Sequence, residues 1–155
     1  MLVVSDTSPL SALLLSKHDD LLRRMFERVV IPPAVKEELL CAHSSLPAWI
    51  EVIEPSTVPD SVAFARLDLG ETEAIALALE LRPEAVLIDE RLGRRLASEH
   101  HLPVTGLLGL FALAKQRGFV SAVVPLIRDV QLHGNCWFGG RLLQGVCESV
   151  GETWM

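Results

Sequence analysis

The chain has 155 residues, half of them apolar and 22% charged, which is typical of one globular, soluble domain with a buried core. Its net charge of −6 argues against a protein that wraps nucleic acid on a basic face, although a negative total can conceal a local basic patch. We expect no membrane span and no signal peptide, and three cysteines without a C-x-x-C pair fit a reduced cytoplasmic setting better than a disulfide framework.

In the first half of the chain, short apolar runs alternate with helical patterns. Strands are expected at 2–5, 29–31 and 49–53, the last of them short and at an edge of the sheet. Helices are expected at 10–14, 21–26 and 34–42. Ser8 followed by Pro9 is typical of an N-cap and a first helical position. Residues 54–60 contain two prolines and are expected to form a loop.

The second half continues this alternation. The strongest helix prediction is 70–81, which is rich in Ala, Leu and Glu. Strands are expected at 85–88 and 103–104. Further helices are expected at 61–67, 90–100, 106–117, 120–132 and 141–150, with a loop at 134–140. Alternating strands and helices with short links predict a three-layer α/β fold, a central and mainly parallel sheet flanked by helices. We expect a single domain over 1–155.

Four acidic residues stand where strands are expected to pass into helices, far apart in the sequence. They are Asp6, Glu38, Glu71 and Asp89. In an alternating α/β chain, strand ends and the neighbouring helices gather at one edge of the sheet. Carboxylates brought together there repel one another unless a positive charge lies between them. A divalent cation is the simplest such charge, so the pattern indicates a metal-dependent enzyme.

Asp6 and Glu38 each have an ordinary alternative role. An Asp at the start of a helix is commonly its N-cap, but Ser8 is expected to cap this helix, which leaves Asp6 for a site. Thr7 and Ser8 could then support its carboxylate. Glu38 shares a helical stripe with small apolar residues, which tilts it inward relative to Glu37, although a helical Glu is more often solvated.

Two further pairs of acids leave a choice of ligand. Glu71 and Glu73 point about 200° apart on one helix, so only one of them can face a given site. We prefer Glu71, because the stripe of Glu73 contains Glu80 and suggests water; alternatively, both acids simply favour the positive end of the helix dipole. Asp89 could equally be the N-cap of the following helix, with Glu90 as the fallback ligand.

Taken together, these segments resemble the PIN domain, the nuclease fold of the VapC-type toxins. The matching stretches are VVSDTSPL at 3–10, IPPAVKEEL at 31–39, GETEAIALALE at 70–80 and VLIDER at 86–91. Residues 102–118 also resemble one PIN-like subfamily of mostly uncharacterised prokaryotic proteins. The resemblance covers nearly the whole chain, and it is the order and spacing of the motifs that make it specific.

The resemblance implies a metal-dependent ribonuclease whose catalytic acids are Asp6, Glu38, Glu71 and Asp89. It implies RNA as substrate, a homodimer, and an antitoxin-like protein as a partner. This chain departs from the commonest pattern in two places. A Glu pair stands where an Asp usually starts the third motif, and the usual T-x-D of the fourth motif is Ile88-Asp89-Glu90.

Carboxylate oxygens suit Mg²⁺ or Mn²⁺ better than zinc. Because Mg²⁺ usually takes one or two carboxylates directly and keeps several waters, Asp6 and Asp89 are expected to bind the ion directly. Glu38 and Glu71 would act through water or at a second ion. The reaction would be hydrolysis of an RNA phosphodiester by water.

Cations must help a polyanionic substrate to reach an acidic site. Candidate phosphate contacts are Arg91, Arg94 and Arg95, which follow Asp89 on one helix, with Lys36 and Lys115 as weaker candidates. The alternative is an ordinary solvated basic face. Trp49, Trp137 and Trp154 are expected to anchor the core, an interface or the tail rather than to stack on bases.

Two rival functions remain. One is a phosphatase with Asp6 as nucleophile, which would want a second acid at position 8, where this chain has Ser8. The other is a weak or inactive PIN-like module used for regulation or protein interaction.

Overall fold

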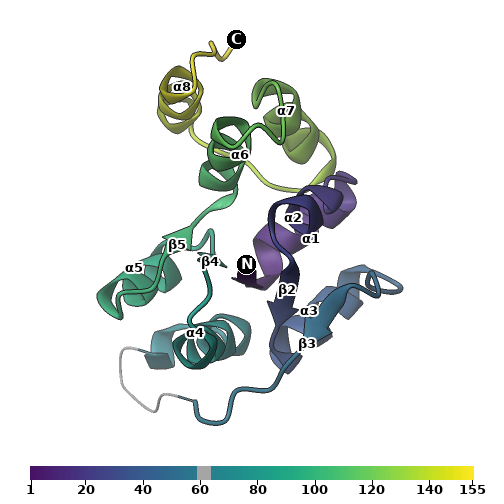
Figure 1. Ribbon diagram of the computed structural model, residues 1–155, viewed down its shortest axis with the longest axis vertical. Coiled ribbons are helices and arrows are strands. Elements are labelled where there is room, and N and C mark those ends of the chain that lie inside the picture. Colours follow the sequence, from purple (N-terminus) through teal and green to yellow (C-terminus); the bar gives the residue numbers. More distant parts are fainter. Residues whose placement is uncertain (59–63) are drawn as a thin grey trace.

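A computed structural model describes residues 1–58 and 64–155 of the chain. Within them, five strands form one sheet in the order β3–β2–β1–β4–β5 (Figure 1). The strands are β1 (Leu2–Ser5), β2 (Arg28–Ile31), β3 (Ile50–Val52), β4 (Ala85–Leu87) and β5 (Val104–Thr105). All four pairings are parallel, so the sheet that we expected to be mainly parallel is wholly parallel in the described part of the chain.

The chain starts in the middle of this sheet and winds outwards in two directions. In β1, Val4 pairs with Val30 of β2 on one side and with Val86 of β4 on the other. The path β1–β2–β3 builds one half of the sheet, and β4–β5 builds the other. The direction of winding therefore switches between β1 and β4, where the carboxyl ends of the strands open a crevice.

Helices cover both faces of the sheet (Figure 1). One face carries α1 (Thr7–Leu15), α2 (Asp20–Met25), α3 (Pro33–Ala42), α6 (Leu107–Gln116), α7 (Val124–His133) and α8 (Gly140–Ser149). The other carries α4 (Leu69–Leu81), α5 (Arg91–Glu99) and the 3-10 turn Phe64–Arg66. Strand side chains alternate between these layers, so Val3 and Val29 join the first core, and Val4 and Val30 join the second. The three-layer α/β prediction is confirmed.

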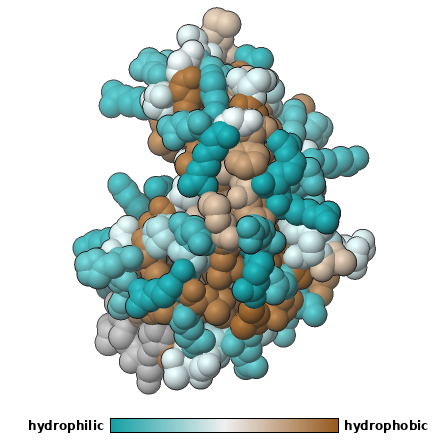
Figure 2. Space-filling model, in the orientation of Figure 1, coloured by the Kyte–Doolittle hydropathy of each residue, from teal (hydrophilic) through white to brown (hydrophobic). Residues whose placement is uncertain are grey.

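The molecule narrows at a waist. The end built from α6, α7 and α8 stands off from the part that contains α4, α5 and β3 (Figures 1 and 2). Figure 2 shows apolar residues between polar ones along the middle of this face. None of the helices in the described ranges is long and apolar enough to cross a membrane.

The start of α1 differs from the prediction. The helix begins at Thr7, so Asp6 occupies the N-cap position that we assigned to Ser8. Even so, the Asp6 side chain makes no capping hydrogen bond within the described residues. The extended backbone of Asp6 (φ −80°, ψ 174°) ends β1 and turns the chain into the helix.

Two other elements differ by more than one residue from their predicted ranges. α7 begins at Val124 instead of 120, because Glu152 accepts hydrogen bonds from the N–H groups of Val123 and Val124 and so defines the helix start. The helix expected at 61–67 lies partly outside the described residues, and Phe64–Arg66 form a 3-10 turn.

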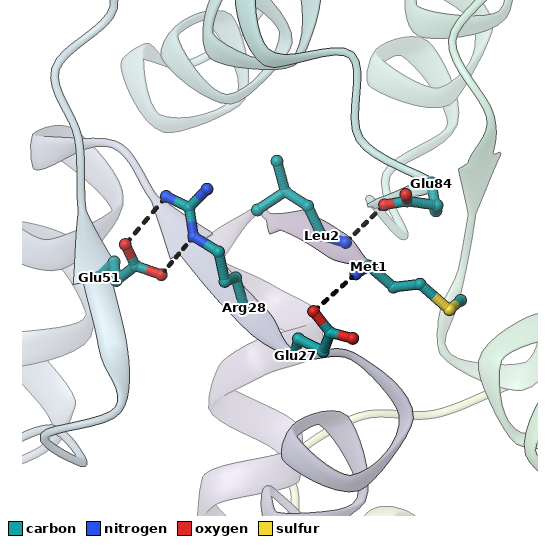
Figure 3. Close-up of polar contacts among 6 residues, drawn as sticks. All are labelled: Met1, Leu2, Glu27, Arg28, Glu51 and Glu84. Carbon is teal, nitrogen blue, oxygen red and sulfur yellow. Dashed lines mark hydrogen bonds and ion pairs between the residues drawn. The ribbon is translucent and has the colours of Figure 1, made fainter.

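The amino ends of the strands form an edge where acidic side chains have positive or N–H partners (Figure 3). The pairs are Arg28 with Glu51 (2.9 Å), the Met1 ammonium with Glu27 (3.4 Å), and the Leu2 N–H with Glu84. Hydrogen bonding to Arg28 holds the pKa of Glu51 below its usual range, and the Leu2 N–H does the same for the pKa of Glu84. Each of these three carboxylates therefore has a partner.

Candidate active site

Asp6 and Asp89 lie at the opposite, carboxyl edge of the sheet, where the winding switches. Asp6 directly follows β1, and its N–H donates to the Leu87 carbonyl of β4 at 2.9 Å. Asp89 follows β4 after one intervening residue. Neighbouring parallel strands thus bring together two carboxylates that are 83 positions apart, at the place where α/β sheets commonly bind ligands.

Glu38 of α3 reaches the same edge. Thr7 Oγ1 donates to Glu38 Oε2 at 2.6 Å, which ties α3 to the start of α1. The other carboxylate oxygen lies against the backbone of α4, because a Cβ built on Gly70 would come 2.5 Å from Glu38 Oε1. Glu38 is half-buried, whereas Glu37 is exposed. The helical stripe therefore correctly predicted that Glu38, and not Glu37, faces this edge.

Glu71 and Glu73 point in different directions, as expected, but the surroundings of Glu73 differ from the prediction. Glu71 is buried, and a Cβ on Gly93 of α5 would come 2.6 Å from its Oε2 atom. Glu73 does not simply face water: it accepts a hydrogen bond from the Ala34 N–H at 3.1 Å, at the start of α3. Glu80 likewise accepts from backbone N–H groups of the preceding loop. The prediction that the Glu73 stripe faces water therefore holds only in part, since Glu80 is exposed but Glu73 is half-buried and bonded to α3.

Asp68 is a member of this acidic edge that sequence reasoning missed. It is the N-cap of α4 and accepts a hydrogen bond from the Glu71 N–H at 2.8 Å. We expected the helix to start at 70, which left Asp68 in the loop. The signal was present, because Asp68 followed three residues later by Glu71, just before an apolar run, is a helix-start pattern.

Asp89 and Glu90 differ in which of them caps a helix, and the cap of α5 is not the residue that the alternative interpretation named. Glu90 caps α5 by accepting from the Gly93 N–H at 2.9 Å, so the alternative in which Asp89 caps that helix is wrong. Asp89 Oδ1 instead accepts from the Leu107 N–H at 2.7 Å, at the start of α6. One of its oxygens is thereby held by the protein, and the carboxylate is only half-buried.

Two buried carboxylate oxygens, Asp6 Oδ1 and Glu71 Oε2, have no hydrogen-bond partner among the described residues. We call them the unpartnered oxygens. The residues that carry them are 4% and 6% exposed, respectively. Buried polar atoms nearly always have a partner, since leaving one unsatisfied costs about 1–3 kcal/mol. Such atoms at a ligand-binding crevice indicate a missing positive group.

The charge on Asp6 is strongly disfavoured in the ion-free protein. Burial raises its pKa to about 7, and repulsion from Asp68, Glu38 and Asp89 adds to the effect of burial. The nearby Thr7 N–H offsets part of this shift without forming a capping hydrogen bond. The three acids that act on Asp6 come from three different segments, so the repulsion reports their convergence.

The pKa of Glu71 is raised further, to about 9. Burial is the largest cause, and the nearby carboxyl groups of Asp68, Asp6 and Glu90 act in the same direction. The charged form of Glu71 is therefore disfavoured when no cation is present.

Opposing effects act on the pKa of Asp89. Burial raises its pKa, while the Leu107 N–H and the positive charge of Arg94 lower it. Asp89 therefore joins the acidic cluster to a basic side chain on α5. The two ends of the sheet thus differ in electrostatics: pairing lowers pKa values at the amino edge, and burial with mutual repulsion raises them at the carboxyl edge.

The donor set of this edge fits a hard divalent cation, because every candidate ligand is a carboxylate oxygen. Across residues 1–58 and 64–155, no three His, Cys, Asp or Glu side chains stand close enough together to hold a metal ion as they are. An ion of the Mg²⁺ type does not need a closed protein cage, since it keeps several waters and takes one or two carboxylates. The unpartnered oxygens are available for that role.

The arginines of α5 border the site. Arg91, Arg94 and Arg95 line a shallow groove that also contains Asp89. Arg94 acts electrostatically on Asp89, whereas Arg95 pairs with Glu99 on its own helix at 3.2 Å. Lys36 is exposed on α3. Lys115 is paired with Glu152 at 2.9 Å, near the chain end, which argues against a phosphate contact.

Thr7 and Ser8 both line a cleft beside Asp89, and Thr7 is the one that contacts an acid of the cluster. The structure brings Asp6, Glu38, Glu71 and Asp89 to one edge. Of the two fallback ligands, Glu73 is turned to α3, and Glu90 lies next to Glu71.

Comparison with known proteins agrees with this architecture. A family model described as PIN domain matches residues 2–152. Among solved structures, the chain is similar to a PilT N-terminus domain protein from the hyperthermophilic archaeon Sulfolobus solfataricus P2. The two share 20% sequence identity with a TM-score of 0.55, over 74% of this chain and 93% of the other. At that identity the likeness shows the fold alone. No curated protein matches the chain.

Proposed function

The chain belongs to the PIN domain family, whose members are generally nucleases, and on that premise we propose that it is a metal-dependent ribonuclease that hydrolyses RNA phosphodiester bonds. We take residues 1–155 as one catalytic domain. The single observation that carries the proposal is the pair of unpartnered oxygens at the switch point of the sheet. They belong to acids whose pKa values are raised to about 7 and about 9.

In this proposal Asp6 and Asp89 hold a Mg²⁺ or Mn²⁺ ion directly, and Glu38 and Glu71 act through water or at a second ion. The bound ion would supply a water of lowered pKa and offset charge on the phosphate. Thr7 keeps the Glu38 carboxylate pointed at the edge through their 2.6 Å hydrogen bond. The Leu107 N–H keeps one Asp89 oxygen fixed, which leaves the other for a ligand.

The remaining chemistry falls to the basic side chains. Arg94 is exposed and borders Asp89, so its guanidinium can bind a phosphate next to the acids without being neutralised by an ion pair in the described residues. Arg91 and Arg95 extend this groove. The proposal also includes a cytoplasmic setting, a homodimer and an antitoxin-like partner, which rest on the resemblance to toxin nucleases.

The test has two readouts. Titration calorimetry measures binding of Mn²⁺ alone, and a gel assay measures cleavage of unstructured RNA with Mg²⁺ or Mn²⁺ and with excess chelator. We expect Asp6→Asn to weaken Mn²⁺ binding at least tenfold and to lower cleavage by about two orders of magnitude or more, with its circular dichroism unchanged.

Glu51→Gln is the matched control, because it removes one negative charge at the amino edge of the same sheet (Figure 3). We expect it to keep both metal binding and cleavage. Absence of Mn²⁺ binding together with absence of cleavage at high protein concentration would favour the inactive regulatory module. Cleavage retained by Asp6→Asn would remove Asp6 from the site.

A further inference from the structure

A cleft of about 730 Å³ opens beside the acidic edge. It lies between α1, the β5–α6 turn, the loop 134–138 and α8. We call it the Trp137 cleft, after the aromatic residue in its wall. Its volume is within the range of roughly 300–1,000 Å³ that is usual for small-molecule sites.

One end of the Trp137 cleft is part of the acidic site. Asp89, Thr7 and Arg94 all line it, so a molecule in the cleft would meet the catalytic edge and a guanidinium. Cys136 and Trp137 line the same cleft as Asp89, so the loop that carries them is close to that edge. A ligand that spans the cleft would therefore present one end to Asp89 and the other to Trp137.

Trp137 differs from the other two tryptophans. Trp49 and Trp154 pack against the main core, as we expected of anchors, whereas Trp137 is 80% exposed. An exposed indole is a large apolar surface without a folding role. Leu142 of α8, which is 52% exposed, lines the same cleft. Exposed apolar groups that gather in one concave wall indicate a binding surface.

The loop that presents this indole is held in place. The Phe138 N–H donates to the Gln131 side chain at 3.2 Å, and the Cys136 thiol contacts the Val130 carbonyl at 3.4 Å. Gly134 packs so tightly that a Cβ there would lie 2.5 Å from the Val130 carbonyl. The backbone on both sides of Trp137 is therefore fixed, and little backbone entropy would be lost when a ligand covers the indole.

The rest of the lining suits a flat ligand with polar edges. The polar residues Ser8, Ser11, Thr105 and Asn135 line the cleft alongside the apolar groups. Ser11 is further oriented by a 3.0 Å contact with His43. An apolar helix of another protein would bury these polar groups without partners, whereas a nucleobase has donors and acceptors at its rim and apolar faces.

We propose that the Trp137 cleft binds a nucleobase of single-stranded RNA, with the base stacked on the Trp137 indole and the adjoining phosphate at Arg94. This inference rests on the proposed ribonuclease function, because it names the part of the substrate that the same site would grip. Stacking on one aromatic residue tolerates any base, so the cleft would select single strands over duplex rather than one sequence.

The experiment measures RNA binding without cleavage. Fluorescence anisotropy of a labelled single-stranded RNA of about ten nucleotides is followed in the Asp6→Asn background with Mg²⁺. We expect Trp137→Leu, added to that background, to weaken binding roughly tenfold, and Trp137→Phe to stay within about threefold of the parent. Because Trp137 is exposed, both variants should keep the parent thermal midpoint.

A fully abasic strand of the same length makes the readout specific for a base. The parent protein should bind it about tenfold more weakly than the intact strand, and the Trp137→Leu variant should bind the two strands about equally. Equal affinity of Trp137→Leu and parent for the intact strand would overturn the proposal, as would equal affinity of the parent for the intact and abasic strands. So would a change in sedimentation of Trp137→Leu with RNA affinity intact, since the cleft would then be an apolar protein contact.

The two proposals fail separately. If the parent chain shows no metal-dependent cleavage but base-dependent binding at Trp137 holds, the base site stands without the nuclease. If metal-dependent cleavage is present and Trp137→Leu changes neither the affinity for RNA nor the difference between intact and abasic strands, the nuclease stands without the base site.

Discussion

At the scale of single residues, two acids that are close in sequence can have different burial and different hydrogen-bond partners. Glu71 and Glu73 are neighbours on α4, yet Glu71 is buried with an unpartnered oxygen, and Glu73 accepts a hydrogen bond from the start of α3. The difference comes from what each side of the helix meets. One side meets other acids, and the other meets a backbone N–H that needs an acceptor.

This difference predicts opposite consequences for two similar substitutions. Glu71→Gln should lower cleavage of RNA at least about a hundredfold, because it removes a negative ligand charge from the cluster. Glu73→Gln should stay within about threefold in activity, since the amide oxygen can still accept from Ala34, and should cost under about 1 kcal/mol of stability. Cleavage rates and urea unfolding of both variants provide the check. The reverse order of activities would mean that Glu73 faces the substrate.

At the scale of helices and strands, the acidic edge depends on close approach of helix backbones. Gly70 of α4 and Gly93 of α5 leave room for the carboxylates of Glu38 and Glu71, respectively. A glycine is costly in a helix, by about 0.5–1 kcal/mol relative to alanine. Its presence at these two contacts is explained by the carboxylate that occupies the place of its side chain.

Gly93→Ala is therefore expected to favour α5 as a helix but to displace Glu71, whose Oε2 lies 2.6 Å from the added Cβ. We expect Mn²⁺ affinity and RNA cleavage to fall about tenfold or more, with stability changed by less than about 1 kcal/mol. Gly145→Ala on α8 is the control, because no described atom lies within 4 Å of its added Cβ. It should raise stability slightly and leave cleavage alone. A fully active Gly93→Ala would separate Glu71 from the reaction.

At these helix starts, the acids that cap a helix lie next to the acids that are candidate metal ligands. Asp68 and Glu90 cap α4 and α5, and Asp89 holds the start of α6. Each helix start therefore positions one carboxylate of the edge through its own N–H groups. Local helix formation and assembly of the site thus rely on the same hydrogen bonds.

At the scale of the whole molecule, the ion-free protein carries a pH-dependent cost. The pKa of Asp6 rises from 3.8 to about 7 on folding, and that of Glu71 from 4.5 to about 9. At these two carboxyl groups, the folded state thus binds more protons than the unfolded chain between about pH 4 and pH 9. Stability falls wherever the folded state binds more protons and the pH rises, so these two acids destabilise the ion-free protein progressively across this window.

Asp6→Asn should remove the Asp6 part of this cost. We expect the variant to exceed the parent by about 1–3 kcal/mol in free energy of unfolding at pH 8 and by almost nothing at pH 4, in chelator. Urea denaturation at the two pH values measures the difference. Adding Mn²⁺ should shrink the gap at pH 8, because the ion offsets the charge of the parent carboxylate. A gap that does not change with pH would contradict the raised pKa.

The net charge of −6 opposes a polyanion, so the basic groove on α5 should matter at long range. Reversing Arg94 and Arg95 to Glu should weaken RNA binding and reduce the slope of log affinity against log salt by about one unit or more. Arg94 should account for most of this, since Arg95 already pairs with Glu99. Arg23→Glu on α2, an exposed site outside both grooves, is a control. Equal salt slopes in all variants would make α5 ordinary surface.

Much of this architecture could be predicted because the signals are local. Apolar runs such as 2–5 and 85–88 and the helical pattern of 70–81 depend on residues a few positions apart. Strand ends followed by Asp6 and Asp89 are visible in the chain order itself. Parallel pairing then requires both acids to emerge at one edge of the sheet, so their meeting could be anticipated before any coordinates.

The sequence by itself therefore determined the layers, the mainly parallel sheet and four of the acids at the edge. Only the tertiary structure decided which donor each carboxylate meets: Glu73 at α3, Asp89 at α6, and Asp6 at none within the described residues. It also brought Asp68 into the cluster and left Trp137 exposed. The physical reason is the sequence separation of the residues involved. A hydrophobic pattern depends on neighbours along the chain, whereas the partners and pKa of a buried carboxylate depend on atoms that folding brings from distant segments.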